Sequence, residues 1–137
     1  MITYKTPEEI TLLREVGSLL AAALFEVQKS VRPGIAISEL DAIAREYMEE
    51  HGGAPAFLGY GGSRRSPGFP ATLCISINDE VVHGIGTRDI ILADGDIVGL
   101  DIGVRYPANN GMYTDMAVTV GVGTISKEAQ HLIDVTR

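Results

Sequence analysis

Two aspartates, Asp101 and Asp115, stand in segments whose residues alternate between apolar and small or polar types. If the chain turns about Ala108, a hairpin places the two carboxylates directly opposite each other on one face, with Cβ atoms roughly 4.5–5.5 Å apart. Facing carboxylates repel unless they share a proton, point into water or bind cations, and Gly99 and Gly103 leave room for a ligand above Asp101. Hard carboxylate oxygens suit divalent metals, and one bridging carboxylate can span two ions roughly 3.5–4 Å apart. The pattern favours a metal site, with a solvent-facing acidic strand face as the alternative.

His83 is the histidine best placed for chemistry, because it lies where a short apolar segment gives way to a glycine turn. A lone histidine is commonly structural, so both interpretations stay open. His51 and His131 lie on predicted helices and are interpreted as structural. Cys74 lies in an apolar segment without a cationic neighbour, which indicates a packed thiol rather than a nucleophile. The sequence has no serine or cysteine nucleophile motif, P-loop or dinucleotide fingerprint.

The segment from Asp96 to Gly123 predicts two strands joined by a turn. Every second residue of each strand is apolar, while the other set carries one aspartate among mostly small residues, so one face is predicted to be buried and the other to face a cleft. Turn-forming residues at 107–111 join the strands into a hairpin. The buried face is predicted to hold Val98, Leu100, Ile102, Met116, Val118 and Val120.

Two helices are predicted before the hairpin and one after it. Thr6 caps a helix whose apolar positions recur every three or four residues to about Ser30. Ser38 is predicted to open a second helix, which ends at Gly52-Gly53. Ser126 is predicted to cap a third helix that is still running at the last residue.

The segment between the second helix and the hairpin is predicted to form a loop, 54–70, and two strands, 72–77 and 81–83. The loop contains Phe57, Tyr60 and Phe69, which are large side chains for a loop of this composition. They either cap the core or lie over a site. The order of elements predicts an α+β fold, with helices covering one face of a mainly antiparallel sheet.

Length and composition exclude several classes of protein. The 137 residues amount to one domain, and 45% apolar and 21% charged residues are typical of a folded chain. No apolar run is long enough to span a membrane, no secretory signal is visible, and the single cysteine excludes an internal disulfide, so a cytoplasmic location is expected. The net charge of −7 argues against a nucleic-acid partner.

Several motifs together resemble the type I methionine aminopeptidases. They are GFPATLCISINDEVVHGIG at 68–86, GDIVGLDIG at 95–103 and GMYTDMAVTVGVG at 111–123, and the first two predicted helices also resemble those of the family. The match covers essentially the whole chain. The resemblance implies a pita-bread (creatinase/aminopeptidase) fold, in which two pseudo-symmetric α+β halves surround a dinuclear metal site, and this chain would be one of the halves. The activity it implies is hydrolytic removal of the initiator methionine from nascent chains.

The resemblance assigns roles by position. Asp101 would chelate one metal and Asp115 would bridge two divalent ions, for which cobalt, manganese, iron and zinc are all candidates. His83 would be a catalytic histidine near the scissile peptide that also assists substrate binding. The walls of the methionine pocket would be formed by Phe57, Tyr60, Phe69 and Cys74.

Three features depart from the family pattern. Residues 61–68 resemble an insertion, the hairpin turn at 107–110 is longer than usual, and Gly86 follows the HGI signature where a proline is usual. The remaining family ligands, one histidine and two glutamates, belong to the carboxy-terminal half. Residues 1–137 are therefore expected to form the amino-terminal part of a single catalytic domain and to be inactive alone.

Two other functions remain open alongside this interpretation. A proline-specific member of the same fold is the alternative enzyme, and a non-catalytic half that binds a peptide or a partner is the alternative from another class. For the enzyme, the expected partner is a nascent peptide with an amino-terminal methionine, with the ribosome as a further candidate. The full enzyme is expected to be a monomer without membrane or direct nucleic-acid contacts, whereas an isolated fragment is expected to self-associate.

Overall fold

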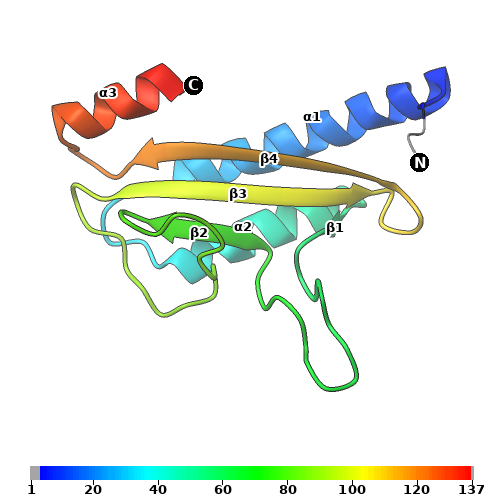
Figure 1. The fold of residues 1–137 in the computed structure, drawn as a ribbon, viewed down its shortest axis with the longest axis horizontal. Coiled ribbons are helices and arrows are strands. Elements are labelled where there is room, and N and C mark those ends of the chain that lie inside the picture. Colours follow the sequence, from blue (N-terminus) through cyan, green and yellow to red (C-terminus); the bar gives the residue numbers. More distant parts are fainter. Residues whose placement is uncertain (1–3, 137) are drawn as a thin grey trace.

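The structure, a computed structural model, describes residues 4–136 as three helices and four strands. In chain order these are α1 (Pro7–Ser30), α2 (Ile37–Glu50), β1 (Ala54–Pro55), β2 (Leu73–Ile77), β3 (Ile97–Tyr106), β4 (Met112–Gly121) and α3 (Lys127–Thr136). Figure 1 shows α1 and α2 behind the sheet and α3 beside β4. The predicted α+β class, with helices over one face of an antiparallel sheet, is confirmed. None of the described helices is both long and apolar enough to cross a membrane.

β3 is the central strand, and every pairing in the sheet is antiparallel. One edge of β3 pairs with β2 and, further along, with the short β1, while the other edge pairs with β4 along its whole length. Figure 1 shows this arrangement as the yellow strand between the orange and green ones. The strand that carries Asp101 is thus paired with other strands along both of its edges.

The core lies between the sheet and the first two helices. Val98, Leu100, Ile102 and Val104 of β3 are all 0% exposed, which confirms the predicted burial of this face. Each such burial stabilises the fold by about 1.5–3 kcal/mol. On β4, Val118 and Val120 pack partly buried against the same core, but Met116 is 41% exposed. The predicted burial of Met116 is wrong: β4 pairs with β3 along one edge and with no other described strand, so its side chains are less completely covered than those of the central strand.

The first helix begins as predicted and the second begins earlier. Thr6 Oγ1 accepts a hydrogen bond from the Glu9 amide at 3.2 Å, and the Glu9 carboxylate accepts from the Thr6 amide at 2.8 Å. The second helix starts at Ile37, so Ser38 lies inside it and is not the cap. There the Glu39 carboxylate accepts from the amide of Ala36 at 3.3 Å, which satisfies the backbone without a serine.

A buried carboxylate joins α2 to the start of β2. Asp41 is 7% exposed, and its Oδ1 accepts from the amides of Thr72 and Leu73, both at 2.8 Å. Burial raises the pKa of Asp41, although these hydrogen bonds act in the opposite direction. The two elements are therefore connected by a polar contact as well as by the core.

The segments on either side of β2 differ from expectation. Residues 81–83 do not form a strand, because His83 takes a left-handed backbone with φ 61° and the chain folds back so that Ile85 bridges Cys74. The predicted loop 54–70 contains the two-residue strand β1, which pairs with β3. Figure 1 shows the rest of this loop projecting away from the sheet.

Candidate active site

One cavity, of about 410 Å³, brings together residues that are far apart in the sequence. The long loop contributes three aromatic rings, β2 a thiol, the following loop a histidine and β3 a carboxylate. Its lining is Phe57, Tyr60, Phe69, Cys74, His83 and Asp101. The three rings of the predicted loop 54–70 therefore line a cavity.

The two aspartates share one face of the hairpin but are offset from each other. Asp101 pairs with Ala117 and Asp115 pairs with Gly103, so the carboxylates are diagonal neighbours. The expectation that they stand directly opposite is wrong, because the hairpin is centred on Asn109 and not on Ala108. A diagonal pair of this kind is roughly 7–8 Å apart between backbone positions, still within reach of a shared ligand.

The environment of Asp101 indicates that the two carboxylates interact. Burial raises the pKa of Asp101, the negative charge of Asp115 raises it further, and His83 acts in the opposite direction. A divalent cation between the carboxylates would remove this repulsion, and their oxygens are the hard donors that such cations prefer. Among residues 4–136, however, no three metal-binding side chains form a group. The donors present fit part of a metal site and do not close one.

The two glycines beside Asp101 have different surroundings. A Cβ on Gly103 would lie 2.7 Å from the ring of Phe57, so this space holds an aromatic ring and not a ligand. A Cβ on Gly99 would meet nothing closer than Ser76 at 3.7 Å, and Gly99 lines an open groove of about 450 Å³. The predicted room for a ligand is found only at Gly99.

His83 lies between the cavity and the groove and lines both of them. Its backbone has φ 61°, a conformation that non-glycine residues rarely adopt and that is frequent at functional sites. The next residue, Gly84, fits closely against β2, since a Cβ there would clash with the carbonyl of Ile75. His83 and Asp101 line the same cavity and the same groove.

Cys74 forms part of the apolar wall. Burial, followed by the nearby charges of Asp101 and Asp115, raises the pKa of the Cys74 thiol to about 11, so it stays uncharged near neutral pH. This agrees with the predicted packed thiol. His51 stacks on Tyr47 with ring centroids 4.1 Å apart, away from the cavity, and His131 lies exposed on α3.

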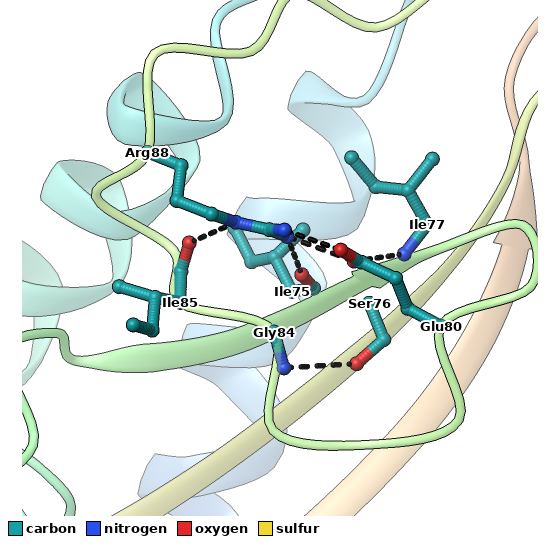
Figure 2. Close-up of polar contacts among 7 residues, drawn as sticks. All are labelled: Ile75, Ser76, Ile77, Glu80, Gly84, Ile85 and Arg88. Atoms are coloured by element: carbon teal, nitrogen blue, oxygen red, sulfur yellow. Dashed lines mark hydrogen bonds and ion pairs between the residues drawn. The ribbon is translucent and has the colours of Figure 1, made fainter.

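Two charged residues beside the site received no role from the sequence, although Glu80 lies within the motif at 68–86 and Arg88 lies just beyond it. Glu80 precedes the loop that carries His83 and Arg88 follows it, and their side chains form an ion pair (Figure 2). The sequence shows only an acidic residue before His83 and a basic residue after it, and this pattern is too common to predict an ion pair. Only the fold shows that the two side chains meet.

Comparison with known proteins gives relatives along the whole chain. A methionine aminopeptidase of Clostridium perfringens is 46% identical over 137 residues, which are 99% of this chain and 51% of that protein. Methionine aminopeptidase 1 of Bacillus subtilis is 42% identical, again over 99% of this chain and 51% of the relative. The chain spans about half the length of the curated relatives it matches.

Solved structures give the same result for the fold. The crystal structure of methionine aminopeptidase from Rickettsia prowazekii matches with a TM-score of 0.89 at 32% identity, over 99% of this chain and 51% of that one. The Thermotoga maritima enzyme matches with a TM-score of 0.88 at 36% identity, over 100% and 51%. Aminopeptidase P of Escherichia coli matches with a TM-score of 0.75 at 22% identity over 96% and 27%, a likeness of fold alone. These structural neighbours confirm the prediction that the chain forms half of a pita-bread fold. Residues 11–137 also match the model of metallopeptidase family M24, and the chain belongs to this family.

Proposed function

We propose that this chain is the amino-terminal part of the catalytic domain of a methionine aminopeptidase, which removes the initiator methionine from nascent polypeptides with the help of divalent metal. The observation that carries the proposal is the cavity with apolar walls that ends at Asp101 and His83. The similarity to methionine aminopeptidases over 99% of the chain supports it.

The wall of the cavity suits a methionine side chain. A thioether packs well against aromatic rings, and three rings line the cavity together with an uncharged thiol. His83 lies at the side of the cavity that carries Asp101, so it would contact the peptide next to the methionyl residue and donate or accept a hydrogen bond there. Residues Phe57, Tyr60, Phe69 and Cys74 would thus bind the substrate and His83 would act in both binding and turnover.

Asp101 and Asp115 would hold the metal. Membership of a metallopeptidase family supports a divalent cation, and the offset carboxylates on one face of the β3–β4 hairpin provide suitable oxygens for it. When bound, such a cation polarises a carbonyl group and makes water a stronger nucleophile. Two ions, from among cobalt, manganese, iron and zinc, are part of the proposal, as are further ligands supplied by a longer chain.

The two alternative functions have different support. The proline-specific peptidases resemble this chain in fold alone, at 22% identity, whereas the methionine enzymes reach 46%. A binding module is favoured by the lack of a three-ligand group in the described residues. A nascent peptide as substrate, contact with the ribosome, a cytoplasmic location and a monomeric full enzyme all follow only from the methionine aminopeptidase assignment.

Peptides that differ only in their first residues test the proposal. The intact protein, supplied separately with manganese, cobalt, iron(II) or zinc, should release methionine from a Met-Ala-Ser peptide and leave a Leu-Ala-Ser peptide essentially uncut. Asp101→Asn should abolish release. Preferential cleavage of an Xaa-Pro peptide would assign the proline-specific function, and metal-independent peptide binding without cleavage would assign a binding module.

A further inference from the structure

The guanidinium of Arg88 lies at the centre of a hydrogen-bond network where the chain enters and leaves the loop between Glu80 and Gly84 (Figure 2). Its Nε donates to the carbonyl of Ile85 at 2.9 Å, and Nη2 donates to the carbonyl of Ile75 at 2.9 Å and to Glu80 Oε2 at 2.8 Å. Nη1 donates to Glu80 Oε1, which makes the ion pair bidentate. The Glu80 carboxylate also accepts from the amide of Ile77 at 2.9 Å. One side chain therefore joins both ends of the loop to β2.

The same loop is attached to β2 by its own backbone. The amide of Gly84 donates to Ser76 Oγ at 3.2 Å, and the amide of Ile75 donates to the carbonyl of Gly84 at 2.7 Å. His83 precedes Gly84 and is itself exposed, so nothing in the core holds its left-handed backbone in place. A conformation of this kind persists only where its surroundings enforce it.

The Glu80–Arg88 pair has properties that exposed ion pairs lack. The two side chains are 35% and 28% exposed, compared with 50% and 39% for Lys29 and Glu26 on α1. A planar guanidinium bonded to a carboxylate through two atoms and to two carbonyls fixes direction as well as distance. The pKa of Glu80 is lowered to about 2, chiefly by the hydrogen bond from Arg88, which agrees with a pair that is formed in the folded protein.

We infer that Arg88 and Glu80 are positioning residues, which hold the loop against β2 so that His83 is presented between the cavity and the groove beside Asp101. The inference rests on the proposed function, because it gives His83 a substrate to meet. Neither residue lines the cavity or contacts Asp101 in the described structure, so their effect on turnover passes through His83.

Conservative variants of the intact protein test the inference. Arg88→Lys keeps the charge but cannot reach Glu80 and both carbonyls together, and Glu80→Gln keeps the shape but loses the charge. We expect Arg88→Lys to lower kcat about 10- to 100-fold on a Met-Ala-Ser peptide with KM within about twofold, since small misplacements of a catalytic group cost this much. Glu80→Gln should have a smaller effect in the same direction. Glu26→Gln, which removes the carboxylate of the exposed pair on α1, is the matched control and should leave both parameters unchanged.

A double-mutant cycle shows whether the effect passes through His83. In a His83→Ala background, Arg88→Lys should cause no further loss of kcat, because residues that act as a unit are not additive. Independent losses that multiply in the double variant would overturn the inference, as would an unchanged kcat in Arg88→Lys.

Amide exchange provides a readout that does not depend on activity. The amides of Gly84 and Ile75 should exchange at least about tenfold faster in Arg88→Lys than in the wild type, while the Leu100 amide in the centre of the sheet stays protected. If the wild type fails to release methionine, the proposed function fails and this exchange result alone decides the inference. Unchanged exchange at Gly84 would then contradict it.

Discussion

At the scale of single residues, the two glycines beside Asp101 differ in what occupies the space above them: an aromatic ring at Gly103 and an open groove at Gly99. Gly103 lies opposite Asp115 in the sheet and allows the ring of Phe57 to rest against the strand. The ring in turn forms part of the cavity wall. Because Gly103 has no side chain, the ring of Phe57 can lie where it forms the cavity wall, although Gly103 itself does not line the cavity.

Gly103→Ala should displace Phe57 and weaken binding of a Met peptide. The added Cβ would lie 2.7 Å from the ring and 3.1 Å from Ala56, so the loop must move, with a loss of stability of about 1–3 kcal/mol. KM is expected to rise more than kcat falls. Gly17→Ala is the control, because a Cβ at this position on α1 would meet nothing within 4 Å. Equal kinetic effects of the two substitutions would contradict this account.

A pH series on Glu80 measures how much the ion pair stabilises the fold. The pKa of Glu80 falls from 4.5 to about 2 on folding, so the unfolded chain binds more protons between these values. The contribution of the pair is fully present above about pH 4.5 and is lost as the pH falls toward 2. The difference in urea unfolding free energy between wild type and Glu80→Gln should shrink over this range and stay constant from pH 5 to 7. A difference that grows on acidification would exclude the pair as its source.

At the scale of elements, a strand face proved easier to predict than a strand register. The alternation on β3 identified its buried residues and placed Asp101 and Asp115 on the same face, since both follow from a period of two. The register depends on how the five residues at 107–111 turn, and those residues carry no hydrophobic pattern that specifies it. The misassigned strand at 81–83 has the same origin, because β-branched valines favour a strand locally while His83 and the return of the chain to β2 decide otherwise.

Removing the Asp41 carboxylate should loosen the junction between α2 and β2. Asp41→Ala leaves the amides of Thr72 and Leu73 buried without a partner, which should cost about 2–4 kcal/mol in unfolding free energy, because each unsatisfied buried group costs about 1–3 kcal/mol. Asp41→Asn keeps an acceptor oxygen and should cost less. Urea denaturation of both variants measures the difference, and equal losses would show that packing, and not hydrogen bonding, sets the effect.

At the scale of the whole molecule, apolar side chains remain exposed on the side of the sheet away from α1 and α2. Val81 and Val82 are 89% and 62% exposed beside the groove, and Leu132 and Val135 of α3 are 58% and 64% exposed. The curated relatives are about twice as long as this chain, so they contain further residues that could cover such a surface. The resemblance to a family singled out the six residues that line the cavity, because it assigns roles position by position. The exposed apolar surface could not be predicted in this way, because no local sequence pattern shows which residues of a folded protein cover one another.

The 137-residue chain by itself should therefore associate at micromolar concentration. Exposed apolar surface and an open sheet edge both favour association. Sedimentation velocity should show dimers or larger species, and replacing Leu132 and Val135 together by glutamate should shift them toward monomer. A monodisperse monomer with a cooperative thermal transition would show that the chain closes its own core.

The central place of β3 also implies an order of events during folding. β3 and β4 are neighbours in sequence and close a short turn, whereas β1 and β2 reach β3 only after longer segments have been ordered, which costs more entropy and time. The hairpin is thus the expected nucleus onto which the remaining strands assemble. Val98→Ala in the hairpin should slow refolding, whereas Pro55→Ala in β1 should leave the refolding rate unchanged and, where it destabilises, accelerate unfolding, as stopped-flow kinetics would show. The strand that carries Asp101 would then be in place before the rings and the histidine loop close around it.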